Sequence, residues 1–278
     1  MLSLSLEETS LESPGLGAVI LLAVLQGVAE FLPISSSGHL VLARGLVGLE
    51  EAGLSLDVAL HVGTLAAVLV AYRLEVAQLI RDLFSGKFHM IGWLIVATIP
   101  VGVAGVLLDD VLDRAAQTSV VAGCGLFATA IFLIVGDRAR RRLGSAADED
   151  EGGYGLPAWR LAVLLGLAQM LAIFPGVSRS GTTIAAGLLL GLPIAQAARY
   201  SFLMSIPAIL GAAVFKLPDA MSEGIGDLEA SWVLIGIAIA GVAGWASLRA
   251  LLVVTSRGAF PWFAGYCALL GASALLFL

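Results

Sequence analysis

Charge is scarce in this chain. Charged residues make up 13% of its 278 residues, whereas hydrophobic residues make up 59%. Soluble domains carry about 25% charged and about 45–50% apolar residues, so the composition excludes an ordinary water-soluble domain. The 15 Lys and Arg residues, against 21 Asp and Glu, are too few to form the basic surface that nucleic-acid binding requires. We therefore expect a polytopic protein that lies in a lipid bilayer and binds no nucleic acid.

Cysteine is nearly absent as well. The two cysteines, Cys124 and Cys267, lie in uncharged apolar runs, which excludes a disulfide framework and a cysteine metal cluster. The N-terminal segment is acidic at Glu7, Glu8 and Glu12 and lacks the positive region that begins a signal peptide. We therefore expect both cysteines to be packing residues and the first apolar run to be retained.

Long uncharged runs are abundant, and they are of two kinds. The runs at 16–29 and 161–177 each lead through a segment rich in Pro, Gly and Ser into a second, shorter apolar piece. Irregular backbone at membrane depth is tolerated only where protein or water surrounds it, so we predict a re-entrant helix hairpin at each. The remaining runs are predicted transmembrane helices at 56–72, 91–108, 118–136, 201–215, 231–248 and 259–278. The predicted fold is thus all-α, with two hairpins that are each followed by three transmembrane helices.

The distribution of charge predicts the orientation. Most basic residues lie in the segments 73–90 and 137–160, whereas most acidic residues lie on the opposite side of the predicted bilayer. Since short cytoplasmic loops carry an excess of Lys and Arg, both termini are predicted to lie outside the cell. The acidic run at 148–151 then belongs to a cytoplasmic linker, predicted at 137–159.

The two halves of the chain resemble each other at a constant offset of 143 residues. The matching pairs are Gln26 and Gln169, Phe31 and Phe174, Ser35 and Ser178, Ser37 and Ser180, and Gly38 and Gly181. We predict a single membrane domain made of one repeat at 17–136 and another at 160–278. Three crossings in each repeat turn the second repeat upside down relative to the first. Inverted repeats place binding sites between interrupted helices near the bilayer midplane, where the two hairpin tips can meet.

The first tip reads Gln26-Gly-Val-Ala-Glu30-Phe-Leu-Pro-Ile-Ser35-Ser36-Ser37-Gly-His39. Ionisable residues inside a membrane are costly and indicate function. Glu30 is a candidate cation ligand or proton acceptor and shares a helix face with Gln26, and His39 is a candidate acid, base or nucleophile. The alternative is a serine-rich loop bonded to its own backbone, with Glu30 and His39 as a structural pair.

The second tip reads Pro175-Gly176-Val177-Ser178-Arg179-Ser180-Gly181-Thr182. Successive N–H groups ahead of a helix favour an anion, and the planar fork of Arg179 suits phosphate oxygens. The tip therefore predicts a phosphate clamp. The alternative is a purely structural salt bridge between Arg179 and Glu30.

Together these motifs resemble the undecaprenyl-diphosphatase (BacA/UppP) family over nearly the whole chain. The resemblance implies hydrolysis of a polyprenyl diphosphate lipid to the monophosphate at the outer face, with Mg²⁺ or Ca²⁺. It makes Glu30 a metal ligand or base, with Gln26 as a further metal ligand. It makes Ser36 or His39 the nucleophile or proton donor. Arg179 would clamp the diphosphate, and the assisting residues would be Ser35, Ser37, Gly176, Ser178, Ser180, Gly181 and Thr182. Gln26 departs from the family pattern, in which many members have Glu.

The runner-up function is a polyprenyl-phosphate flippase or secondary transporter, because inverted repeats with re-entrant hairpins also form transporters. A carrier needs the Arg179 clamp but neither a nucleophile nor a proton donor, so Ser36 and His39 favour the enzyme. Asp57 and His61, four residues apart at the head of a predicted span, either pair with each other or lie near the site. The glycine-rich spans permit close helix packing, and a homodimer is left open.

Overall fold

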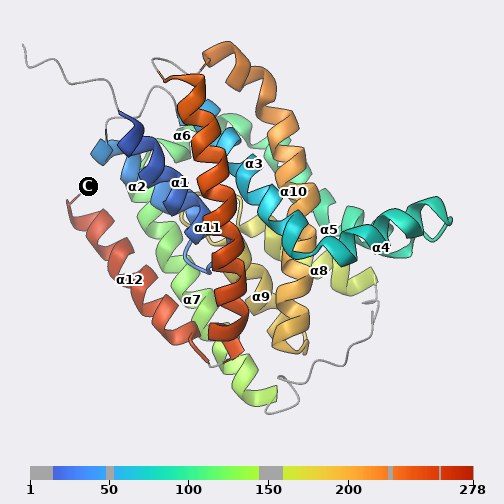
Figure 1. The fold of residues 1–278 in the computed structure, drawn as a ribbon. Helices are drawn as coiled ribbons and strands as arrows, with labels where there is room; N and C mark the ends of the chain where they lie inside the picture. The colour runs from blue at the N-terminus through green and yellow to red at the C-terminus, as the bar shows by residue number, and fades with distance from the viewer. Residues whose placement is uncertain (1–14, 48–52, 144–158, 225–227, 257, 278) are drawn as a thin grey trace, which may run out of the picture.

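A computed structural model describes residues 15–47, 53–143, 159–224, 228–256 and 258–277. These residues form twelve α-helices and no strand, as the all-α prediction requires (Figure 1). The helices are α1 (Leu16–Phe31), α2 (Ser36–Val47), α3 (Gly53–Ala71), α4 (Arg73–Phe84), α5 (His89–Leu107), α6 (Asp109–Ala116), α7 (Ser119–Leu143), α8 (Trp159–Leu171), α9 (Arg179–Leu189), α10 (Ile194–Glu223), α11 (Ala230–Ser256) and α12 (Phe260–Phe277).

Among the described residues, six helices are long and apolar enough to cross a membrane. They are α3, α5, α7, α10, α11 and α12, and each overlaps one of the six predicted spans over most of that span's length. The apolar helices α1 and α8 are shorter, as expected for arms of hairpins that do not cross. The prediction of a multi-pass helical membrane protein is therefore confirmed.

Each short apolar helix turns back through a brief irregular segment. Leu32 to Ser35 connect α1 to α2, and residues 172–178 connect α8 to α9. In Figure 1 the α1–α2 hairpin begins and ends in the upper part of the bundle, whereas α8 and α9 lie lower and lead down to the start of α10. The two connections consequently approach each other inside the bundle.

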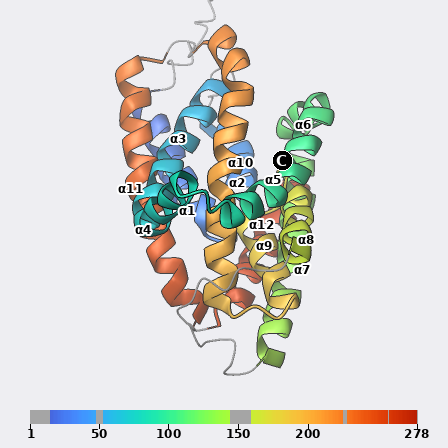
Figure 2. The same cartoon turned by 90° about the vertical axis from the view of Figure 1, so that its right-hand side faces the viewer.

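The helices around the hairpins pack in corresponding pairs. Helix α1 packs along α11, and α8 packs along α5; α3 contacts α10, and α7 lies against α12. Glycines bring these helices into backbone contact. A Cβ on Gly27 of α1 would lie 2.7 Å from the Ala240 carbonyl oxygen of α11, and one on Gly166 of α8 would lie 2.5 Å from the Ala97 oxygen of α5. Seen from the side, α10 and α11 run the height of the bundle (Figure 2).

Several boundaries differ from the prediction because a helix does not end where its apolar run ends. Helix α7 continues to Leu143, into the predicted linker, where Asp137 pairs with Arg140 and Arg141 at 3.4 and 2.7 Å. Helix α10 extends at both ends of its predicted span. The segments between predicted spans that carry α4 and α6 each form a short helix with a polar face.

Candidate active site

The two hairpin tips meet backbone to backbone. A Cβ on Gly38 would lie 2.9 Å from the Cα of Gly176. Gly176 has a φ of 88°, which L side chains rarely adopt, and a Cβ there would lie 2.1 Å from the carbonyl oxygen of Ala122 in α7. The neighbouring Gly125 of α7 leaves equally little space, at 2.2 Å from the Pro175 oxygen. Glycine is therefore required on both sides of this contact.

A side chain from α7 fastens the second tip. The Thr129 hydroxyl donates to the carbonyl oxygen of Gly176 at 2.7 Å and accepts from the N–H of Ser178 at 2.8 Å. The Ser180 hydroxyl donates to the Leu32 oxygen of the first tip at 3.2 Å. These bonds hold the loop that carries Arg179 in one position relative to the first hairpin.

Equivalent serines cap the returning arm of each hairpin. The Ser35 hydroxyl accepts from the Gly38 N–H at 3.2 Å, and the Ser178 hydroxyl accepts from the Gly181 N–H at 3.1 Å. Serine is favoured at helix N-termini because its oxygen satisfies a free N–H. The Ser-x-x-Gly pattern shared by both halves is thus explained by this capping hydrogen bond, which each serine accepts from the glycine three residues later.

Glu30 is the centre of the polar site. Its Oε1 accepts from Arg179 at 2.6 Å, and its Oε2 accepts from the Ser36 hydroxyl at 2.6 Å and from the Gln26 amide at 3.1 Å. The His61 Nε2 lies 3.7 Å from the same Oε2. A carboxylate that is only 8% exposed is thus joined to an arginine, a hydroxyl and an imidazole. The Arg179–Glu30 salt bridge that was the structural alternative does exist, and it lies at the edge of a cavity.

This polar cavity has a volume of about 380 Å³ and is bounded by both tips together with α3, α6 and α10. The residues that line it include Glu30, Ser35, Ser36, Ser37, Asp57, His61, Gln169, Ser178 and Arg179. Catalytic and binding sites are commonly clefts in which a few polar groups converge on a largely apolar wall. The cavity is therefore the candidate active site.

His39 does not line this cavity. Its Nδ1 and the Ser35 carbonyl oxygen are 2.7 Å apart, and its Nε2 lies 2.7 Å from the Tyr266 hydroxyl of α12, with the two rings stacked. It also makes no pair with Glu30, whose partners are those described above. The structure brings Glu30, Ser36 and Arg179 together and leaves His39 behind the first tip.

His61 takes the position at the cavity that the sequence suggested for His39. Its Nδ1 contacts the backbone oxygen of Asp57 at 2.7 Å, so that the opposite nitrogen faces Glu30. The Asp57 carboxylate pairs with Arg44 instead, so the two side chains suggested as a pair do not bond to each other. The spacing of Asp57 and His61 at the head of α3 was the only sequence signal for this histidine.

The remaining predicted residues divide by position. Of the second tip, Ser178 and Arg179 line the cavity. Four others lie behind them and support the loop; these are Gly176, Ser180, Gly181 and Thr182. In the first tip, Ser37 lines the cavity and its hydroxyl lies 3.3 Å from that of Ser35.

Gln26 and Glu30 are the residues that offer oxygen donors for the divalent cation that the resemblance implies. The Oε1 of Gln26 is buried without a hydrogen-bond partner, and it belongs to the side chain that also contacts Glu30. No group of three or more His, Cys, Asp or Glu suited to a metal occurs among the described residues. Mg²⁺ commonly binds through one or two carboxylates together with substrate phosphates. The donors present therefore suit an ion that shares its ligands with a phosphorylated substrate.

The fold and the site define a multi-pass helical membrane protein with a carboxylate, hydroxyl and arginine centre buried between two hairpin tips. A family model described as "Bacitracin resistance protein BacA" matches residues 19–273. The chain belongs to this family.

Relatives named undecaprenyl-diphosphatase match over almost the whole chain. The protein from Desulfatibacillum aliphaticivorans is 39% identical, over 93% of this chain and 97% of the relative. The protein from Methanosphaera stadtmanae is 37% identical, over 91% and 95% of the two chains. The protein from Corynebacterium glutamicum is also 37% identical, over 96% and 92%.

Proposed function

We propose that this protein is an undecaprenyl-diphosphatase, which hydrolyses a polyprenyl diphosphate to the monophosphate and phosphate. This activity recycles the lipid carrier of cell-envelope glycan synthesis and confers resistance to bacitracin. The observation that carries the proposal is the joining of Ser36 and Arg179 to one buried carboxylate, Glu30, at 2.6 Å each. The nucleophile, its base and an anion-binding group thus share one membrane-embedded cavity.

The reaction follows from these contacts. Arg179 and the N-terminus of α9 bind the diphosphate, since both favour phosphate oxygens. Because Arg179 contacts Glu30 without substrate, the incoming diphosphate competes for its guanidinium and leaves the carboxylate free to act as a base. The Ser36 oxygen then attacks the terminal phosphorus as its proton passes to Glu30, and the anhydride bond to the lipid monophosphate breaks.

Water completes the cycle. It attacks the phosphorus of the phosphoserine formed at Ser36, Glu30 returns its proton to the serine oxygen as the P–O bond breaks, and phosphate leaves as H2PO4⁻ with both hydrogens of the water. His61, 3.7 Å from Glu30, lies beside this proton transfer. Mg²⁺ or Ca²⁺, held by Glu30 and Gln26, would neutralise charge on the diphosphate.

The proposed test is phosphate release from a C15 diphosphate by the purified full-length protein. We expect release that stops when a chelator removes divalent cations and returns when Mg²⁺ or Ca²⁺ is added. Substrate binding without phosphate release in the presence of either cation would instead favour the flippase or transporter. Phosphate release that is insensitive to the chelator would support the proposed phosphatase activity but contradict the proposed need for a divalent cation.

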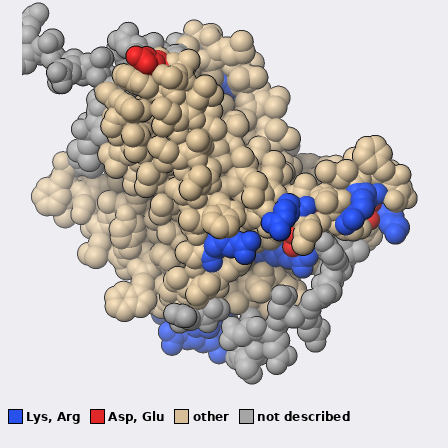
Figure 3. Space-filling view, in the orientation of Figure 1, with Lys and Arg blue, Asp and Glu red and all other residues tan. Residues whose placement is uncertain are grey.

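The repeats and their orientation also belong to the proposal. The matched packing of α1 on α11 and α8 on α5 supports two repeats, and three spans in each imply that the second repeat is inverted. Lys and Arg gather over α4 and the lower part of the face in Figure 3, which supports a cytoplasmic position for that end. The polar cavity, bounded by α6 at the opposite end, would then open to the outer face.

Cysteine labelling in intact cells tests this orientation. In a Cys124→Ser background, Ser85→Cys beyond α4 is expected to resist a membrane-impermeant thiol reagent added outside, whereas Ser222→Cys at the end of α10 is expected to react. Both serines are exposed, so accessibility to a permeant reagent provides the control. The reverse labelling pattern would contradict the proposed orientation.

A further inference from the structure

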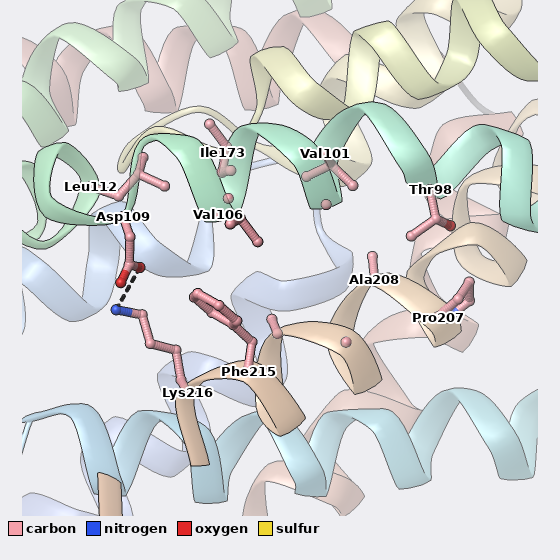
Figure 4. Close-up of a pocket in the computed structure, with 14 residues that line it drawn as sticks. Thr98, Val101, Val106, Asp109, Leu112, Ile173, Pro207, Ala208, Phe215 and Lys216 are labelled. Atoms are coloured by element: carbon pink, nitrogen blue, oxygen red, sulfur yellow. Dashed lines mark ion pairs between the residues drawn. The ribbon is translucent and has the colours of Figure 1, made fainter. Parts of the chain in front are cut away.

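A second cavity, also of about 380 Å³, forms an apolar groove between α5 and α10. Figure 4 shows the two helices facing each other across it, with Thr98 and Pro207 near one end. At the other end, Lys216 of α10 pairs with Asp109 at 2.8 Å. Apart from these end residues, the side chains that line the groove are apolar.

Glycines keep the groove open. A Cβ on Gly102 of α5 or on Gly211 of α10 would meet nothing within 4 Å, and one on Gly105 would meet only the Ile173 side chain at 3.7 Å. These glycines therefore do not serve helix packing, in contrast to the glycines between the hairpin tips. Glycine in a helix interior costs about 1 kcal/mol of stability relative to alanine. Here no neighbouring helix packs into the space that the missing side chains leave.

The groove is continuous with the polar cavity. The two share the residues Val101, Leu112, Ile173, Ala208, Ala212 and Lys216. Its outer edge faces the surface, where Val106 and Phe215 remain 59% and 44% exposed on helices that are candidate membrane spans. One connected space therefore has a phosphate-binding end and an apolar end that opens toward the hydrocarbon of the bilayer.

We propose that this groove binds the isoprenoid chain of the substrate, in the units next to the diphosphate; the proposal rests on the proposed function above. A molecule with a phosphate head and a hydrocarbon chain matches both ends of the connected space. A methyl-branched isoprenoid is wider than a straight acyl chain, and the empty volume at Gly102 and Gly211 receives such branches. The groove thus selects the lipid by its chain, whereas Arg179 binds the head.

Leucine substitutions test this assignment. Gly102→Leu and Gly211→Leu place a side chain in the groove from opposite sides, at positions where a Cβ meets no atom within 4 Å. Activity is compared on a C15 and a C5 prenyl diphosphate, which share a head but differ in chain length. Because burying several carbons contributes to affinity, we expect the ratio of kcat/KM for C15 to that for C5 to fall roughly 100-fold in each variant. Gly265→Leu is the matched control, because a Cβ on this exposed α12 glycine also meets nothing within 4 Å, and its ratio should stay at the wild-type value.

Each other outcome has a definite meaning. A wild-type ratio in both groove variants would overturn the proposal, as would an equal loss on both substrates. If the wild-type protein released phosphate from neither diphosphate, the proposed function itself would fail.

Discussion

Replacing Arg179 by alanine is expected to lower kcat/KM for polyprenyl diphosphate roughly 10³-fold. Arg179 is the cation in contact with the central carboxylate, at 2.6 Å from Glu30 Oε1. Its loss removes the group that would bind the diphosphate and stabilise charge as the anhydride breaks. It also leaves Glu30 buried without its positive partner. Phosphate release measured over a range of substrate concentrations gives the effect on kcat and on KM separately.

Two further variants test whether activity requires the guanidinium group of Arg179 or only its positive charge. Arg179→Lys retains the positive charge but loses the planar fork, and we expect it to recover only part of the activity. Arg141→Ala removes an arginine that is 65% exposed and pairs with Asp137 at the far end of α7, and it should behave as wild type. Near-normal turnover by Arg179→Ala would contradict the phosphate clamp. It would favour the alternative in which Arg179 only forms a structural salt bridge with Glu30.

Replacing Ser36 by alanine is expected to lower kcat on the order of 10⁴-fold, with a smaller change in KM, because the variant lacks the attacking oxygen. Ser36 is the serine whose hydroxyl contacts Glu30, at 2.6 Å. The wild-type protein should also form a phosphoserine that can be trapped by rapid quenching and located by mass spectrometry. The alanine variant should form none.

The neighbouring serine and histidine provide the comparison. Ser37→Ala, one residue along the same tip, removes a hydroxyl that contacts only Ser35 among the described side chains, and it should lower kcat by no more than about tenfold. His39→Ala breaks contacts to Ser35 and Tyr266, so it should lower thermal stability together with activity. Trapped phosphate on His39 instead of Ser36 would reverse the assignment of the nucleophile.

Apolar length predicted most of this fold. Helix α5 begins and ends within two residues of its predicted span because Gly86 and Lys87 precede that run and Asp109 follows it. The predicted ends of α7 and α10 were wrong, because both helices continue beyond their apolar runs. Hydropathy reports where a helix leaves the hydrocarbon, whereas the helix itself continues until a cap or a turn, as α7 does through its Asp137–Arg141 pair.

The sequence predicted the site residues that lie close together within one motif. It did not predict the contacts that depend on how distant helices pack. Motif chemistry placed Glu30, Ser36 and Arg179 together, and the structure agrees. The direction of a side chain is another matter. His39 follows the serines by one turn of α2, but α12 provides Tyr266 as its partner and draws the ring away. His61 reaches Glu30 because α3 packs beside α1, a contact that no local pattern reveals.

The glycine contact between Gly38 and Gly176 has a kinetic consequence. Where two backbones touch, no side-chain rotamer can change the spacing between the tips, so the distance between the backbone of the first tip and that of the loop that carries Arg179 follows from the course of the main chain. An enzyme in water must reorient its surroundings as charge develops on the reacting phosphate. Here the dipoles are already aligned by the folded backbone. The share of the reorganisation energy that belongs to these backbone dipoles is therefore supplied once, when the chain folds, whereas the Arg179 side chain still exchanges Glu30 for the diphosphate at each turnover.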